Sequence, residues 1–308
     1  MKPKYRVRNW SEYNHGLKQR GSLTFWIDEK VLSQWMTTKK TGKKGASNLF
    51  SDQAIITFMT LKCLFQLAGR QTQGLLESLF SLMNIDLPVP DHSTVSRRMG
   101  KLQIKIPVTK QDQPRHVVID STGIKVYGEG EWKTRTYGVS KRRTWRKLHL
   151  AVDETSGEIL VAEVTTNDYH DSEIFPELLS NIEGEIEQVS ADGAYDTQGC
   201  YEQIEKEKAT ATIPPQHNAN KRKEKVLEQR NKTIERIEEV GRKQWKQESG
   251  YHRRSLSETA MFRLKKIFGG TLSSREFENQ AVELFIKCMM LNRMIQIGKP
   301  ESYVVSEN

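Results

Sequence analysis

Three segments with the alternating apolar pattern of β-strands follow one another in the middle of the chain. They are HVVIDSTGIKV (residues 116–126), WRKLHLAVD (145–153) and EILVAEVTT (158–166). Helix and strand patterns then alternate, with a helix at 171–181, a strand at 187–194, a helix at 197–206 and a strand at 209–214. Consecutive strands followed by such an alternation predict an α/β fold built on one mixed, five-stranded sheet.

Two of these strands end in an aspartate, and the order of the segments is that of an RNase H-like sheet. Asp120 closes the apolar run VVI, and Asp192 closes the run VSA. An ionised carboxylate beside buried apolar strands needs a partner or a metal ion. Hard oxygen ligands favour Mg²⁺ or Mn²⁺ and exclude a zinc-type site. We therefore expect the pair at one edge of the sheet as metal ligands; a turn cap is the alternative for either aspartate alone.

A third group of candidate residues lies closer to the C-terminus. Tyr251, Arg254, Glu258 and Lys265 are spaced 3, 4 and 7 residues apart. At 3.6 residues per turn they fall within an arc of about 60° on one helix. A surface salt bridge between Arg254 and Glu258 explains that pair but leaves Tyr251 and Lys265 unexplained. The spacing predicts one helix face with a carboxylate, two cations and an aromatic hydroxyl.

The N-terminal third is polar and helical rather than strand-like. Residues 1–48 form a basic segment of unclear fold, and residues 49–104 contain two amphipathic helical patterns and a short third one. Asp91 is a candidate cap for this third helix, which carries Arg97 and Arg98. Hydroxyl residues and arginines on a short helix after two apolar helices are typical of a helix-turn-helix. We predict a helical DNA-binding domain here, with an ordinary helical bundle as the alternative.

The positive charge of the chain is unevenly distributed. The first 115 residues carry 19 basic and 8 acidic side chains, and residues 132–149 carry seven basic side chains and no acid. Trp and Tyr residues are interleaved with these cations, which suits a nucleic acid because cations neutralise phosphates and rings stack on bases. Arg142, Arg143 and Lys147 are therefore candidate DNA contacts, and a solvated basic hairpin is the alternative.

These motifs together resemble those of a known family. The sequence YHRRSLSETAMFRLK matches the Tyr-x2-Arg-x3-Glu-x6-Lys signature of the bacterial insertion-sequence DDE transposases at every defined position. VVIDSTGIKVYG, VSADGAYD and WRKLHLAVDE are also similar to the strand motifs of that family. The resemblance covers about residues 48–294, and the chain is similar in particular to the insertion sequence five branch.

The resemblance implies a domain organisation. It implies an RNase H-like catalytic domain at 116–298, with a charged insertion or helix at about 216–250. We expect a linker at 105–115 before this domain and a tail at 299–308 after it. The helical region that precedes the linker would then bind the ends of the element.

The resemblance also implies the chemistry of the site. Asp120, Asp192 and Glu258 would be the catalytic triad and would bind Mg²⁺, with Mn²⁺ as a substitute. Tyr251, Arg254 and Lys265 would hold DNA phosphates near the cleaved end. The partners would be double-stranded DNA, both terminal inverted repeats and target DNA, and a second copy in a homodimer. No nucleotide cofactor is expected, because the sequence has no P-loop.

The sequence thus predicts a DNA transposase that cleaves the ends of its own insertion sequence and joins the 3′ ends to target DNA by two-metal phosphoryl transfer. An RNase H-like nuclease without strand transfer is one alternative, and a non-catalytic, transposase-derived DNA-binding protein is another. No stretch approaches the ~20 apolar residues of a membrane helix, so we expect no membrane partner. The first residues show neither an apolar h-region nor a small-residue cleavage site, so we expect a cytoplasmic, nucleoid-associated location.

Several other polar residues receive ordinary structural interpretations. Asp171 and Asp196 are predicted to cap helices, and Asp153 to lie in a turn. Lys147 and His149 alternate on the second strand and could face the site. Three widely separated cysteines predict neither disulfide bonds nor a structural zinc site.

Overall fold

The structure is a computed structural model that describes residues 4–38, 49–126 and 145–305. Its contacts divide the chain into two compact units. One unit is formed by Met1–Pro107 and Met289–Asn308, and the other by Val108–Cys288. Among the described residues, no helix combines the length and the apolar character that crossing a membrane requires.

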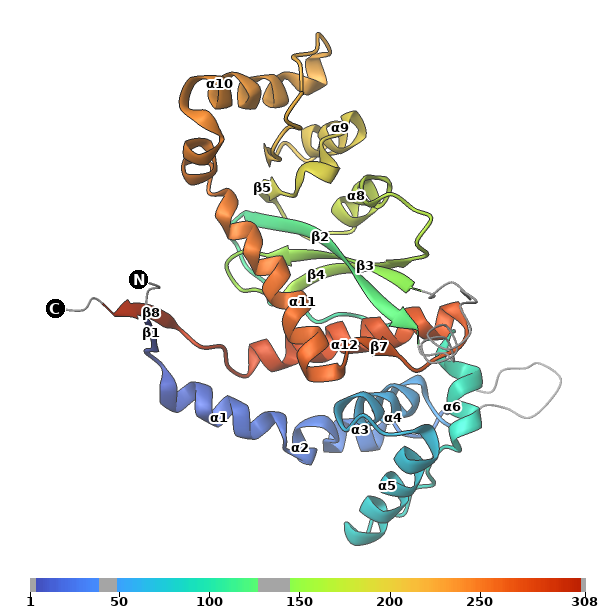
Figure 1. The fold of residues 1–308 in the computed structure, drawn as a ribbon. Coiled ribbons are helices and arrows are strands. Elements are labelled where there is room, and N and C mark those ends of the chain that lie inside the picture. The colour runs from blue at the N-terminus through green and yellow to red at the C-terminus, as the bar shows by residue number, and fades with distance from the viewer. Residues whose placement is uncertain (1–3, 39–48, 127–144, 306–308) are drawn as a thin grey trace, which may run out of the picture. The chain divides into compact units, whose positions relative to one another are not determined.

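The first unit is mostly helical (Figure 1). Its elements are β1 (Lys4–Val7), α1 (Trp10–Arg20), α2 (Leu23–Trp26), α3 (Glu29–Ser33), α4 (Asp52–Leu64), α5 (Gly69–Leu82), α6 (His92–Met99) and β8 (Ser302–Val305). Strand β1 pairs with β8 in antiparallel fashion, so both ends of the chain contribute to this unit. The three helices predicted for this region are confirmed as α4, α5 and α6.

Side chains at the helix starts explain where these helices begin. The Ser51 hydroxyl accepts a hydrogen bond from the backbone N–H of Ala54 at the start of α4. Asp91 does the same for the N–H of Ser93 at the start of α6, over 2.8 Å. Both caps satisfy N–H groups that have no partner inside the helix. The apolar faces of the three helices pack on one another through buried residues that include Phe58, Leu61, Leu76, Phe80, Val95 and Met99.

The second unit contains the predicted mixed sheet. Its strands are β2 (Arg115–Val126), β3 (Trp145–Asp153), β4 (Ile159–Thr165), β5 (Ile186–Ser190), β6 (Thr210–Thr212) and β7 (Thr271–Leu272). The order is β4-β3-β2-β5-β6, with β2, β3 and β4 antiparallel and with β5 and β6 parallel to β2. The α/β prediction, with three antiparallel strands before the alternation of helix and strand, is confirmed. Strand β7, which was not predicted, pairs with the end of β2.

Helices cover both faces of this sheet (Figure 1). Helices α8 (Asp171–Ser180) and α9 (Gln198–Lys206) pack on one face, and α11 (Ser255–Phe268) contacts β2 and β3 from the other. Side chains alternate along a strand, so Val117 and Ile119 of β2 enter the core under α8 and α9. The neighbouring Asp120 faces α11.

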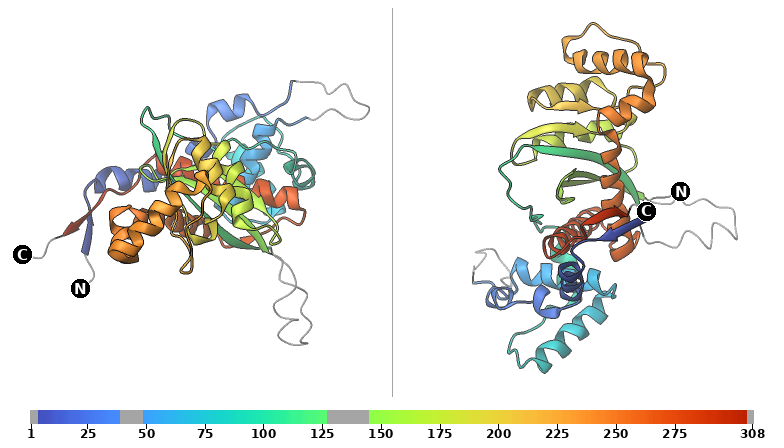
Figure 2. Two further views of the ribbon diagram at one scale, coloured as in Figure 1. Left: turned by 90° about the horizontal axis from the view of Figure 1, so that it is seen from above. Right: turned by 90° about the vertical axis from the view of Figure 1, so that its left-hand side faces the viewer.

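The charged region near residue 230 is a helix at the edge of the sheet. Helix α10 (Glu228–Glu248) follows a short 3-10 turn, η2 (Lys225–Leu227). The side chain of Gln229 binds the carbonyl of Ala209 and the N–H of Ala211, and so covers the free edge of β6. A non-helical glycine, Gly241, kinks the helix. The right-hand view in Figure 2 shows α10 in orange above the yellow α9. The last helix, α12 (Phe277–Gln296), follows β7.

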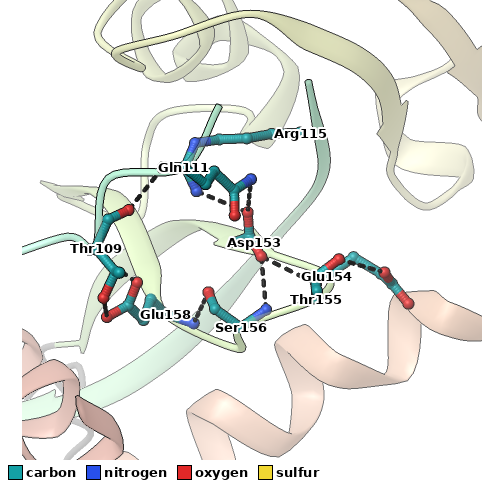
Figure 3. Close-up of polar contacts among 8 residues, drawn as sticks. All are labelled: Thr109, Gln111, Arg115, Asp153, Glu154, Thr155, Ser156 and Glu158. Carbon is teal, nitrogen blue, oxygen red and sulfur yellow. Dashed lines mark hydrogen bonds and ion pairs between the residues drawn. The ribbon is translucent and has the colours of Figure 1, made fainter. Parts of the chain in front are cut away.

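A buried ion pair fixes the beginning of β2 (Figure 3). The Arg115 guanidinium binds Asp153 at 2.8 Å, and both side chains are almost fully buried. Burial alone would raise the pKa of Asp153, but hydrogen bonds from Ser156 and Arg115 outweigh it, so this pKa is lowered. Asp153 is the last residue of β3 and not a turn residue as predicted, but its carboxylate accepts the backbone N–H of Ser156 in the turn that follows. Thr109 in turn binds the carboxylate of Glu158, so residues just before β2 are attached to the β3–β4 turn.

Candidate active site

The two predicted aspartates come from neighbouring strands. Asp120 lies in the middle of β2 and not at its end, contrary to the expectation, because β2 continues its pairing with β3 beyond this residue. Asp192 follows β5, whose last paired residue, Ser190, is opposite Val118 of β2, and Asp192 is close enough for its charge to act on Asp120. Burial raises the pKa of Asp120, and the charge of Asp192 raises it further. Two neighbouring carboxylates of this kind favour a cation between them.

Arg254 connects Asp120 with the third predicted acid. Its Nη1 donates to Oδ2 of Asp120 at 2.7 Å, and its Nη2 donates to Oε1 of Glu258. Ser257 also donates to Oδ2 of Asp120, over 3.2 Å. The guanidinium therefore lies between two of the three predicted catalytic carboxylates. Asp192 uses one oxygen to accept the N–H of Ala194 at 2.8 Å.

The expectation of one continuous helix from Tyr251 to Lys265 is wrong. Tyr251–Arg254 form a 3-10 turn, η3, and α11 begins at Ser255. Gly250, with a positive φ of 69°, separates α10 from this segment, and the first turn after it is a tighter 3-10 turn, as is frequent at the N-terminus of an α-helix. Arg254 and Glu258 nevertheless meet, because four residues across this junction still correspond to about one turn.

The remaining two residues of the signature have clear positions. Lys265 donates from Nζ to the hydroxyl of Thr122 at 2.6 Å, two residues beyond Asp120 on β2. The centre of the Tyr251 ring lies 5.9 Å from the centre of the Trp245 ring. The ammonium of Lys246 lies 5.0 Å from the centre of the Tyr251 ring. Tyr251 is thus held by the end of α10, and Lys265 is held against the strand that carries Asp120.

The donor set fits a hard divalent cation, because all three predicted ligands are carboxylates. Among the residues that the structure describes, no three His, Cys, Asp or Glu side chains lie in an arrangement that could hold a metal ion. The guanidinium of Arg254 lies between Asp120 and Glu258, and this position explains why these two carboxylates do not meet at a common point. A cation shared by those two carboxylates requires the guanidinium to release at least one of them.

Asp171 does not cap its helix, contrary to the expectation. His170 occupies the N-cap position of α8, and its side chain makes no capping hydrogen bond. The carboxylate of Asp171 instead forms an ion pair with Lys147 at 3.0 Å. Lys147, predicted as a DNA contact, also donates to the carbonyl of Tyr169 at 2.7 Å. His149 is fully buried, and burial lowers its pKa to about 4.

Asp196 does not cap α9 either. Its carboxylate forms a buried, two-oxygen ion pair with Arg230 of α10, at 2.7 and 3.2 Å. Thr197 is the N-cap residue of α9, and its side chain makes no capping hydrogen bond. The pair fixes the turn that follows Asp192, and sequence reasoning missed it because the partner is 34 residues away.

The predicted basic contacts outside the sheet differ in their surroundings. Arg97 is on the exposed side of α6, where it binds the hydroxyls of Ser93 and Thr94. Arg98 is mostly buried and binds the carboxylate of Asp52 at 2.6 Å. Arg142 and Arg143 lie outside the described residues.

Comparison with known proteins gives two matches to family models that are both described as a transposase DDE domain. One covers residues 18–129 and the other residues 111–293. Among solved structures, the cryo-EM structure of a piggyBac transposase synaptic complex with hairpin DNA aligns with 95% of this chain and 77% of that chain, at 10% sequence identity and a TM-score of 0.43.

Proposed function

Because the chain belongs to the transposase DDE domain family, we propose that it binds the terminal inverted repeats of its own insertion sequence, cleaves the element ends and joins the 3′ ends to target DNA. The observation that carries this proposal is the position of Asp120 beside Asp192, with Arg254 linking Asp120 to Glu258. This arrangement lies in a mixed sheet with the strand order β4-β3-β2-β5-β6. We infer an RNase H-like catalytic domain from that order.

Asp120, Asp192 and Glu258 are the proposed catalytic residues and ligands of Mg²⁺, with Mn²⁺ as a substitute. Two such cations would activate the attacking oxygen and stabilise the leaving oxygen of an in-line displacement. The protein would hold them through the carboxylate oxygens of Asp120 on β2, of Asp192 after β5 and of Glu258 on α11. Arg254, Lys265 and Tyr251 surround this site and would position the phosphates of the DNA backbone.

The proposed reaction needs no nucleotide cofactor. In the first step, water attacks a phosphodiester at the element end, the P–O3′ bond breaks, and a free 3′-OH and a 5′-phosphate result. In the second step, this 3′-OH attacks a phosphodiester of the target, and the target 3′ oxygen leaves with a proton. One phosphodiester forms as one breaks, so strand joining requires no external energy source.

We further propose that residues 49–104 recognise the element ends. Helix α6 follows α4 and α5, packs on both and presents Arg97 on its exposed side. This is the order of elements in a helix-turn-helix, whose last helix reads the major groove. Two ends must be held together for transposition, so the complex with DNA is proposed to contain a homodimer.

The proposal can be tested with purified protein, Mg²⁺ and a labelled duplex that carries the repeats flanking its gene, with the Glu258→Gln variant as control. We expect the wild type to cut at the repeat boundary and to join the new 3′ end to a second DNA, and the variant to do neither. Cleavage without joining would favour a nuclease. Binding without cleavage in either Mg²⁺ or Mn²⁺ would favour a non-catalytic DNA-binding protein.

A further inference from the structure

The carboxylate of Asp171, the first residue of α8, is bound by residues of the sheet. Both of its oxygens are bound by strand residues. Oδ1 accepts a hydrogen bond from Lys147 of β3 at 3.0 Å, and Oδ2 accepts one from the hydroxyl of Ser121 of β2 at 2.8 Å. Asp171 therefore attaches the start of α8 to two adjacent strands, at the position where β2 carries its catalytic candidate.

Ser121 connects Asp171 with Asp120 through hydrogen bonds to both carboxylates. It follows Asp120 directly, and its backbone N–H donates to Oδ1 of Asp120 at 2.8 Å. The other oxygen, Oδ2, is bound by Arg254 and Ser257. Successive side chains of a strand point to opposite faces, so the Ser121 hydroxyl and the Asp120 carboxylate lie on opposite faces of β2. The backbone between them connects the two.

We propose that Asp171 is a positioning residue for Asp120. By fixing Ser121, it holds the N–H of Ser121 against Oδ1 of Asp120 and sets the direction in which this carboxylate meets a divalent cation. The inference rests on the proposed function, in which Asp120 is a metal ligand. Groups that hydrogen-bond behind metal ligands orient them, and their removal typically costs about 10–100-fold in metal affinity or activity.

Asp171 acts through Ser121 and is not itself a ligand of the cation. Lys147 and Ser121 already bind its two oxygens, and the positive charge of Lys147 balances the carboxylate. The ring of His149 lies behind this pair, with Nδ1 at 3.9 Å from Oδ1 of Asp171. These contacts hold the carboxylate in one orientation, as a positioning role requires.

Tyr195 shows independently that Asp171 lies within electrostatic range of the site. This tyrosine is 1% exposed, and its hydroxyl makes no hydrogen bond with any residue that the structure describes. Burial raises its pKa, and the charges of Asp171, Asp120 and Asp192 raise it further, in that order. The charges of Asp171 and of two proposed metal ligands therefore act on the same group, the hydroxyl of Tyr195.

The test measures metal binding by the full-length protein without DNA, using the Mn²⁺ signal in electron paramagnetic resonance. We expect Asp171→Asn and Ser121→Ala to raise the Kd for Mn²⁺ by about tenfold. Ser121→Thr keeps the hydroxyl and should bind Mn²⁺ as the wild type does. Asp168→Asn removes an exposed carboxylate from the loop just before α8 and serves as the charge-matched control. End cleavage as a function of Mg²⁺ concentration is the second readout.

Wild-type Mn²⁺ affinity in Ser121→Ala would overturn the inference, because this variant removes only the link from Asp171 to Ser121. If Asp171→Asn unfolds, the comparison of Ser121→Ala with Ser121→Thr decides the question, with thermal unfolding as the check on folding. A wild-type protein that binds Mn²⁺ and cleaves, with all variants alike, would refute this inference alone. A wild-type protein that does neither would refute the proposed function and the inference with it.

Discussion

The guanidinium of Arg254 is bound to the carboxylate of Asp120, with 2.7 Å between Nη1 and Oδ2. The same guanidinium binds Glu258, which lies one turn further along the chain. Only 20% of the Arg254 side chain and 14% of the Asp120 side chain are exposed, so water screens this pair weakly. Arg254 therefore competes with a divalent cation for the carboxylate of Asp120, although the arginine and the cation are both expected to take part in DNA cleavage.

This competition predicts opposite effects of Arg254→Gln on binding and on catalysis. Removing the guanidinium frees Oδ2 of Asp120 and removes a neighbouring positive charge, so Mn²⁺ should bind more tightly, by about tenfold. End cleavage should fall, because the proposed phosphate contact is lost. Calorimetric titration with Mn²⁺ and a cleavage assay would measure the two effects. Equal Mn²⁺ affinity in the variant and the wild type would show that Arg254 does not compete for the site.

Asp192→Asn should separate activity from stability. The charge of Asp192 contributes to the raised pKa of Asp120, so the two negative charges repel each other. An amide at position 192 keeps an oxygen that can accept the N–H of Ala194, so the turn should remain intact. We expect cleavage to be abolished, while DNA binding and the melting temperature stay equal to or above those of the wild type. A clearly lower melting temperature would instead assign Asp192 a structural role.

The two arginines of α6 should behave differently. Arg97→Ala is expected to weaken binding to the element ends and to reduce the salt dependence of binding by about one phosphate contact, with no loss of stability. Arg98→Ala removes hydrogen bonds to Asp52 and to the carbonyl of Phe50. It should lower the free energy of unfolding by about 1–3 kcal/mol. Urea unfolding and a binding titration at several salt concentrations distinguish the two, and unchanged end binding in Arg97→Ala would remove α6 as the recognition helix.

Local patterns were sufficient to predict the strands that build the site. The predicted segment 145–153 coincides with β3, and Asp192 follows the end of β5 as predicted, whereas Asp120 lies in the middle of β2 and not at its end. Strand β7 was missed because two residues carry no periodic signal, and its structure depends on pairing with Lys125, far away in the sequence.

The two incorrect predictions of helix caps share one cause. Asp171 is the first residue of α8 and Asp196 comes just before the N-cap of α9, and a local rule assigns residues at a helix start to caps. In the structure, Ser121 lies 50 residues from Asp171, and Arg230 lies 34 residues from Asp196. These long-range partners bind the carboxylates instead, and a sequence pattern does not contain such contacts. The 3-10 turn Tyr251–Arg254 was missed for another reason, since residue spacing does not distinguish such a turn from the first turn of an α-helix.

Breaking the ion pair between Arg230 and Asp196 should destabilise the second unit strongly. Both side chains are nearly buried, so Arg230→Ala leaves an uncompensated carboxylate, at a cost of about 3–5 kcal/mol. Arg236→Ala is the matched control, because Arg236 lies on the same helix in exposed ion pairs worth at most about 1 kcal/mol. Chemical unfolding of both variants measures the difference. Equal stabilities would show that α10 is not anchored through Arg230.

His149 should make the stability of the protein depend on pH between about 6.5 and 4. Burial lowers the pKa of its imidazole from 6.5 to about 4, so the folded protein keeps this ring neutral. Below pH 6.5 the unfolded chain binds a proton that the folded chain does not, and stability therefore falls as the pH decreases towards 4. The difference of about 2.5 pH units corresponds to about 3 kcal/mol. Urea unfolding at a series of pH values should show a shallower decline in His149→Gln than in the wild type. His217→Gln, at an exposed position, should retain the wild-type slope, and a wild-type slope in His149→Gln as well would mean that another group causes the loss.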